Sequence, residues 1–182
     1  AEYNKVPAQV LITKMTMTND TMRDNAKNTF RKLLEMGVIP VVNENDTVAT
    51  DEIEFGDNDT LSALVAALIG ADMLILLSDI DGLYTDDPKN NPKAEFIEQI
   101  DYITDDLESI AKGAGSDVGT GGMSTKIIAA RIANDAGADM VITNGADMSN
   151  LRRVMNGENV GTLFLAHKSE NFHLIDYLNK EH

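Results

Sequence analysis

The chain has 182 residues, 43% hydrophobic and 25% charged, which is the size and composition of one globular domain with its own core. Its net charge of −15 argues against a nucleic-acid partner, because such binding depends on Lys and Arg contacts to phosphate, and favours a small molecule held by a local cluster. No cysteine is present for disulfides or thiolate zinc sites, no apolar run approaches the ~20 residues of a membrane span, and no signal peptide is visible, so we expect a cytoplasmic protein without a membrane partner.

The first part of the chain predicts strands that alternate with helices. Residues 10–13 are apolar and β-rich, which indicates a strand. Residues 25–35 carry a helical periodicity that ends at Gly37. Residues 38–43 are almost continuously apolar and predict a strand buried on both faces. A short excursion over residues 47–55 could form a hairpin.

The rest of the chain continues this alternation. Residues 73–77 predict the most clearly buried strand. The other elements expected, in chain order, are a helix capped at 57–59 and ending at Gly70, a loop at 87–92, a helix with a capping box of Asp105 and Glu108 ending near Gly113, a helix at 124–135 ending at Gly137, a strand at 140–143, a short helix at 150–155 and a strand at 161–164.

Alternating strands and helices imply crossover connections and a mainly parallel sheet covered on both faces, so the predicted fold class is α/β. We expect one domain over residues 1–168 and a tail at 169–182, either an additional helix or frayed. Ligands of such folds bind at the carboxyl ends of the strands. Three expected strands are followed there by polar clusters, at residues 43–46, 78–82 and 143–145. These clusters predict one shared site.

Two of the acidic segments suit a small substrate with an ammonium group. Residues 43–46 (Asn-Glu-Asn-Asp) carry amides and carboxylates, of which an Asx turn would explain one or two. A calcium loop over 43–54 is excluded because Val48 stands where that loop needs glycine. Residues 57–59 (Asp-Asn-Asp) begin a helix, and capping explains only one of them. The others could orient lysines or bind a substrate amine.

Asp79 and Asp81 follow the strand at 73–77. They could approach phosphates only through Mg²⁺, or could instead contact a ribose or a lysine. An exposed loop with a glycine turn is the other interpretation, and the sequence leaves these alternatives open.

Residues 119–126 (Gly-Thr-Gly-Gly-Met-Ser-Thr-Lys) are the most informative segment. The glycines let backbone N–H groups approach an anion at the entrance of a helix, whose dipole also favours negative charge. The spacing is not that of a P-loop, and a turn that only starts a helix is the alternative. Lys126 lies where a cation opposes the helix dipole, which suggests that it neutralises charge on a transferring phosphoryl group. A solvated surface lysine is the alternative.

Taken together, these segments resemble the amino acid kinase family, in the branch that phosphorylates the γ-carboxylate of glutamate. Single motifs are shared with acetylglutamate, aspartate and uridylate kinases, but the whole set is specific. The resemblance covers nearly the whole chain in the family's order, through residues 38–46, 55–63, 76–85, 119–126 and 160–164.

The resemblance implies a three-layer αβα sandwich with a mainly parallel sheet, glutamate and MgATP (ATP with Mg²⁺) as substrates, a homo-oligomer, and the first step of proline biosynthesis. It makes Lys126 the residue that stabilises the transferring phosphoryl group and Asp59 the aspartate that organises the catalytic lysines. Asp46 and Asn58 match glutamate-binding positions, and no residue is assigned as a metal ligand. The positions that match the ATP site are Ser78, Asp79, Thr120, Gly121, Gly122, Met123, Ser124, Thr125 and Lys126.

The sequence departs from the family at its start. Members open with a strand that leads to a lysine and a Gly-Ser loop, and neither occurs here. We therefore expect this chain to lack the N-terminal part of the domain, to form its ATP side, and to be inactive alone. Ser78 stands where the family often has Thr, and no RNA-binding (PUA) extension follows Phe164.

Two alternatives stay open. One is another kinase of the family, although a uridylate kinase should show basic residues for a second phosphate. The other is a non-catalytic nucleotide-binding module.

Overall fold

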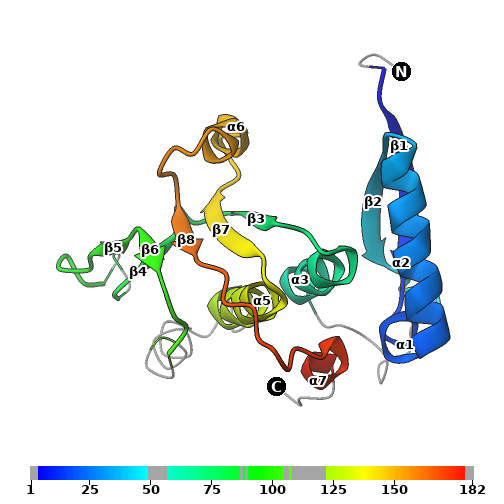
Figure 1. Ribbon diagram of the computed structural model, residues 1–182. Helices are drawn as coiled ribbons and strands as arrows, with labels where there is room; N and C mark the ends of the chain where they lie inside the picture. Colours follow the sequence, from blue (N-terminus) through cyan, green and yellow to red (C-terminus); the bar gives the residue numbers. More distant parts are fainter. Residues whose placement is uncertain are drawn as a thin grey trace.

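The computed structural model describes residues 4–48, 57–86, 88, 90–104, 107 and 122–178. Strands alternate with helices along most of this length, as the sequence predicts (Figure 1). In chain order the elements are β1 (Val6–Ile12), α1 (Lys14–Thr18), α2 (Asp20–Glu35), β2 (Val38–Glu44), α3 (Asn58–Ile69), β3 (Met73–Ser78), β4 (Leu83–Tyr84), β5 (Phe96–Ile97), β6 (Gln99–Ile100), α5 (Gly122–Ala136), β7 (Asp139–Asn144), α6 (Ser149–Met155), β8 (Thr162–Phe164) and α7 (Leu174–Leu178).

The central sheet has four strands in the order β3-β7-β8-β6. β3 pairs with β7, and β6 with β8, in parallel, whereas β7 and β8 are antiparallel. α3 and α5 lie on one face of this sheet and α6 lies on the other (Figure 1). The predicted α/β class, with helical layers on both sides of a mainly parallel sheet, is confirmed.

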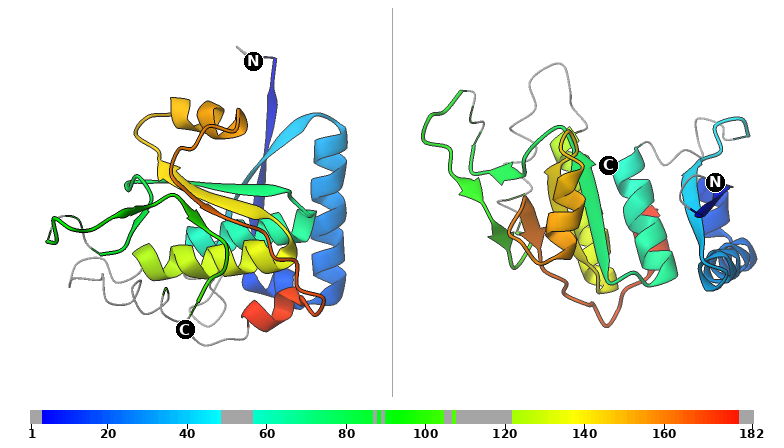
Figure 2. Two further views of the ribbon diagram at one scale, coloured as in Figure 1. Left: turned by 60° about the vertical axis from the view of Figure 1, so that its left-hand side comes forward. Right: turned by 90° about the horizontal axis from the view of Figure 1, so that it is seen from above.

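β1 and β2 form a separate parallel pair of strands beside the central sheet (Figure 2). Side chains of β2 alternate between half-buried and exposed, and Ile39 and Val41 are 49% and 54% exposed. The prediction that residues 38–43 are buried on both faces is therefore wrong. α2 packs on this pair, and the face of β2 that carries Ile39 and Val41 is left exposed.

β3 is also less buried than its apolar sequence predicts. Leu76 is buried, but Met73 and Leu77 are 37% and 40% exposed. β3 lies at the edge of the four-stranded sheet, and an edge strand has a neighbour on one side only. The strand prediction for residues 73–77 is confirmed, and the burial prediction is wrong.

Both ends of α3 follow their capping signals. The Asp57 carboxylate accepts a hydrogen bond from the Thr60 backbone N–H at 2.7 Å and caps α3, which ends at Gly70 with a left-handed φ of 68°. α2 begins at Asp20, earlier than the predicted residue 25, and α1 was not predicted. Most of the expected hairpin at 47–55 and of the expected helix that ends near Gly113 lies outside the described residues.

α3 and α5 lie side by side and supply much of the core (Figure 1). Small side chains let two helices approach closely, because no long side chain holds the backbones apart. The buried alanines of the two helices are Ala63, Ala66, Ala129, Ala130 and Ala133. This packing lets the first turns of α3 and α5 meet, which matters for the site below.

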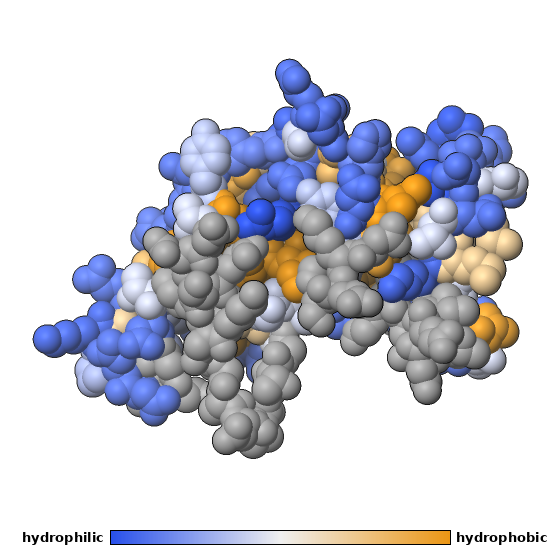
Figure 3. All heavy atoms as spheres, turned by 90° about the horizontal axis from the view of Figure 1, so that it is seen from below, coloured by the Kyte–Doolittle hydropathy of each residue, from blue (hydrophilic) through white to orange (hydrophobic). Residues whose placement is uncertain are grey.

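On the side opposite α6, the part of the surface formed by described residues is mainly hydrophilic, with hydrophobic side chains visible near its middle (Figure 3). This agrees with the excess of acidic residues in the sequence. Within the part of the chain that the structure describes, none of the helices has both the length and the apolar character needed to cross a membrane.

The C-terminal segment packs back onto the domain. Leu178 of α7 is buried in the core, and the Tyr177 hydroxyl donates a hydrogen bond to the Asp135 carboxylate at the end of α5. Burial, and then the hydrogen bond to Asp135, raise the pKa of Tyr177 above its usual value. Of the two alternatives for the tail, an additional helix is present as α7, while the domain boundary at residue 168 stays a prediction.

We expect the Tyr177→Phe variant to lose about 1 kcal/mol of unfolding free energy at neutral pH, because the hydrogen bond to Asp135 is removed. In the unfolded chain Tyr177 ionises near pH 10, whereas the folded state keeps its proton to higher pH. The contribution is therefore complete below about pH 10 and is lost as the pH rises through the folded pKa. Urea unfolding at neutral pH and at about pH 11 should show the difference from wild type shrinking. If the difference in unfolding free energy between wild type and Tyr177→Phe does not change with pH, the hydrogen bond to Asp135 is not its cause. Tyr102→Phe, at an exposed ring, is the control.

Candidate functional site

The first turn of α3 presents three polar residues in three different directions. Asp57 caps the helix and also accepts a hydrogen bond from the Thr60 hydroxyl at 2.8 Å, so its carboxylate is used structurally. Asn58 lines a cavity beside β2, and Asp59 reaches the neighbouring helix α5. Successive helical residues point about 100° apart, which explains how adjacent positions serve three purposes.

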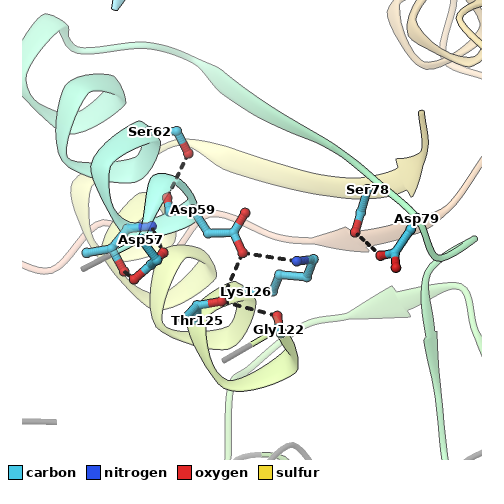
Figure 4. A network of polar contacts seen from close by, with 9 residues as sticks. Asp57, Asp59, Ser62, Ser78, Asp79, Gly122, Thr125 and Lys126 are labelled. Atoms are coloured by element: carbon cyan, nitrogen blue, oxygen red, sulfur yellow. Dashed lines mark hydrogen bonds and ion pairs between the residues drawn. The ribbon is translucent and has the colours of Figure 1, made fainter. Parts of the chain in front are cut away.

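Asp59 joins the first turns of the two helices. Its Oδ2 atom accepts a hydrogen bond from Lys126 Nζ at 3.0 Å and another from the Thr125 hydroxyl at 2.9 Å (Figure 4). The Lys126 and Asp59 side chains are only 12% and 24% exposed. A charge pair that is mostly shielded from water is weakly screened, so removing one member leaves the other charge poorly compensated.

Lys126 is the fifth residue of α5 as described, and its amino group is not a solvated surface group. The alternative of an exposed lysine is therefore excluded. The Asp59 carboxylate offsets the unfavourable position of a cation near a helix N-terminus. The ion pair also ties α3 to α5, so a structural contribution accompanies any role of Lys126 in binding.

A second part of the predicted site lies where β3 and β7 end. Ser78 pairs with Asn144 in the parallel register, and the backbone N–H of Gly145 donates to the Ser78 carbonyl at 2.7 Å. The Asn144 amide donates to Asp81 at 2.8 Å. The structure thus brings together the polar clusters 78–82 and 143–145. The cluster at 43–46 follows β2 of the separate strand pair, so the expectation of one shared site is met for two of the three clusters.

The Ser78 hydroxyl donates to its neighbour Asp79 at 3.1 Å. Figure 4 shows this pair at the end of β3, in the same view as Lys126 and Asp59. Among the hydrogen bonds between described residues, none joins the Ser78–Asp79 pair directly to Lys126. The Asp81 carboxylate accepts its hydrogen bond from the Asn144 amide. Whether Asp79 or Asp81 contacts Mg²⁺ or a ribose stays open.

A cavity of about 350 Å³ lies between β2 and α3. Its lining residues are Val42, Asn43, Asn58, Leu61, Ser62 and Val65. Both amides of the lining come from segments that the sequence marks as polar clusters, and the remaining wall is largely apolar. The described lining contains no basic side chain, which suits a small substrate better than a second phosphate.

Asn58 lines this cavity and Asp46 does not, and the substrate-binding roles of both residues stay predictions. Asp46 lies in the turn after β2 and is exposed. Asn43 lines the cavity instead, although it was not singled out as a substrate-binding residue. Its place in the polar cluster at residues 43–46, at the carboxyl end of the expected strand, was the available signal.

The glycine-rich segment is described only from Gly122 onward. Thr120 and Gly121 lie outside the described residues. Gly122 is exposed, Met123 packs against the core, and Ser124 is half-buried. The predicted roles of these residues in ATP binding therefore stay predictions. The helix that the segment enters is confirmed as α5.

The described residues contain no group of three or more His, Cys, Asp or Glu side chains that could hold a metal ion. Mg²⁺ commonly binds through one or two carboxylates together with substrate phosphates, so it needs no complete protein cage.

The sequence profile described as "Amino acid kinase family" matches residues 1–144. Two curated relatives named glutamate 5-kinase illustrate the likeness. The protein of Carboxydothermus hydrogenoformans is 55% identical over 170 residues, which are 93% of this chain and 45% of that protein. The protein of Clostridium perfringens is 49% identical over 173 residues, covering 93% of this chain and 64% of that protein. The chain thus spans about half to two thirds of the length of these relatives.

Solved structures support the fold alone. The isopentenyl phosphate kinase of T. acidophilum, a product complex, has a TM-score of 0.59 at 21% identity, covering 90% of this chain and 61% of that one. The UMP kinase of Bacillus anthracis has a TM-score of 0.58 at 19% identity, covering 93% of this chain and 62% of that one.

Proposed function

The chain belongs to the amino acid kinase family, and we propose that the natural protein containing it phosphorylates the γ-carboxylate of L-glutamate with MgATP. The product would be glutamyl 5-phosphate, which begins proline biosynthesis. A γ-carboxylate oxygen forms a bond to the terminal phosphorus of ATP. The bond between that phosphorus and the β,γ-bridging oxygen breaks, and ADP leaves with the electron pair of the broken bond on that oxygen. We further propose that the protein acts in the cytoplasm as a homo-oligomer.

One observation carries this proposal: the Asp59–Lys126 pair lies at the same helix end as the amide-lined cavity. Asn58 and Asp59 are neighbours, so the cavity and the Lys126 ammonium are held on two sides of the first turn of α3. Phosphoryl transfer is catalysed mainly by positioning and by neutralising charge on the transferred group. A cavity for an amino acid beside a fixed ammonium meets both needs. The names of the relatives support glutamate as the acceptor.

We assign the remaining residues as follows. Lys126 stabilises the transferring phosphoryl group, and Asp59 holds Lys126. Asp46 and Asn58 bind glutamate, with Asn43 as an addition from the cavity lining. The ATP site is assigned to Ser78, Asp79 and residues 120–126.

The proposal is tested by trapping the acyl phosphate product with hydroxylamine. ATP, Mg²⁺ and either glutamate, aspartate or acetylglutamate are supplied to the natural-length gene product and to residues 1–182 alone. We expect hydroxamate from glutamate with the natural-length protein and none from residues 1–182, because this chain spans only about half to two thirds of the length of its relatives. Product from aspartate or acetylglutamate instead would replace the proposed substrate. A folded protein that binds MgATP but yields no hydroxamate from any acceptor would favour a nucleotide-binding module.

A further inference from the structure

Thr125 and Lys126 converge on one oxygen atom. They are adjacent in α5 and would ordinarily project about 100° apart, yet both donate to Asp59 Oδ2, at 2.9 Å and 3.0 Å (Figure 4). The Thr125 hydroxyl also lies 3.2 Å from the Gly122 carbonyl oxygen, which is the weaker of its two acceptors. A hydroxyl has one proton to donate, and an ionised carboxylate is the stronger acceptor.

We propose that Thr125 is a positioning residue: its hydroxyl fixes the Asp59 carboxylate, and through it the Lys126 ammonium, and it does not donate to ATP. This inference rests on the proposed function and replaces the ATP contact assigned there to Thr125 with a positioning role. With its proton committed to Asp59, the hydroxyl has none left for a phosphate oxygen.

The physical need for such a residue follows from the freedom of the ion pair. Asp59 has two rotatable side-chain bonds and Lys126 has four, so one contact leaves the ammonium several arrangements. A second donor on the same carboxylate oxygen holds that oxygen in place while Lys126 responds to a substrate. Misplacement of a catalytic group by about 1 Å can cost on the order of 100-fold in rate.

The test compares Thr125→Val, Thr125→Ser and Thr29→Val. Valine keeps the branched shape without the hydroxyl, and serine restores the hydroxyl. Thr29 is the control because its hydroxyl also bonds within a helix, to the Asn25 carbonyl at 2.9 Å, on the exposed side of α2. In the natural-length protein we expect Thr125→Val to lower kcat about 10- to 100-fold with the KM for MgATP within about twofold of wild type, since a charged hydrogen bond is lost. Thr125→Ser and Thr29→Val should stay near wild type.

A second measurement does not depend on catalysis. Residues 1–182 are treated with an amine-acetylating reagent, and acetylation of Lys126 is followed by mass spectrometry relative to the exposed Lys32. We expect Lys126 to react several-fold faster in Thr125→Val than in wild type, and serine to restore the slow rate. If no variant has kinase activity but this pattern holds, the proposed function fails and the positioning role stands.

Two results would overturn the inference. A raised KM for MgATP with kcat unchanged in Thr125→Val would make Thr125 an ATP contact. Unchanged kcat together with unchanged Lys126 acetylation would show that the hydroxyl positions nothing.

Discussion

The Lys126→Met variant of the natural-length protein is expected to lose at least about 100- to 1000-fold in kcat, with the KM for glutamate within about threefold of wild type. Methionine keeps the length of the side chain and removes the ammonium that we assign to the transferring phosphoryl group. The ammonium is held 3.0 Å from Asp59 and is largely shielded from water, so its charge acts with little screening. The loss is measured as glutamate-dependent hydroxamate formation at saturating MgATP.

The structural contribution of the ion pair must be separated from this effect. Lys126→Met leaves the Asp59 carboxylate with Thr125 as its remaining donor among the described contacts, which lowers stability as well. Lys32→Met is the matched control, because Lys32 also pairs with a carboxylate, Glu35, at an exposed position. Circular dichroism and thermal unfolding define a temperature at which every variant is folded. Retention of more than about a tenth of the wild-type kcat at that temperature would rule out the role assigned to Lys126.

Of the substitutions proposed here, Gly161→Ala is expected to lower the free energy of unfolding most, by about 3 to 5 kcal/mol. Gly161 has a φ of 93°, where a side chain is strained, and it precedes β8. A Cβ atom there would overlap the carbonyl oxygen of Ile142 in β7 and lie 2.9 Å from the Cβ of Thr143. Both neighbours belong to a buried strand, so the clash could be relieved only by separating β7 from β8.

Gly157→Ala provides the control for this prediction. Gly157 has a similar φ of 77°, but a Cβ atom there would meet nothing within 4 Å. Its cost should be about 1 kcal/mol, from the backbone conformation alone. Thermal unfolding should show a decrease in Tm of about 6–15 °C for Gly161→Ala and of a few degrees for Gly157→Ala. Equal decreases would mean that backbone strain, and not the contact with Ile142, decides the cost.

Local signals in the sequence located most of the elements correctly. Asp57 and Gly70 mark both ends of α3, because capping and a left-handed terminal glycine depend only on neighbouring residues. Ser78 and Asn144 were expected at one edge of the sheet, because parallel strands end on the same side. The same signals missed α1 and the true start of α2 at Asp20.

Burial was predicted less well than secondary structure. An apolar run such as residues 38–43 shows that a strand can be buried, but the neighbouring layers decide how much of it is. Ile39 and Val41 are exposed because α2 covers the other face of β2, and Leu77 is exposed on an edge strand. Which layers cover a strand depends on the assembled fold, so it cannot be predicted from the strand's own sequence.

The sequence by itself determined the α/β class, both caps of α3 and the family, and it supplied the candidate site residues. Only the tertiary structure decided how these residues are used: Asp57 as a cap, Asn58 and Asn43 in one cavity, and Asp59 paired with Thr125 and Lys126. Capping is a contact between near neighbours, so it is visible in the order of residues. The Asp59–Lys126 pair joins residues 67 positions apart, and it exists because the packing of α3 against α5 brings their first turns together.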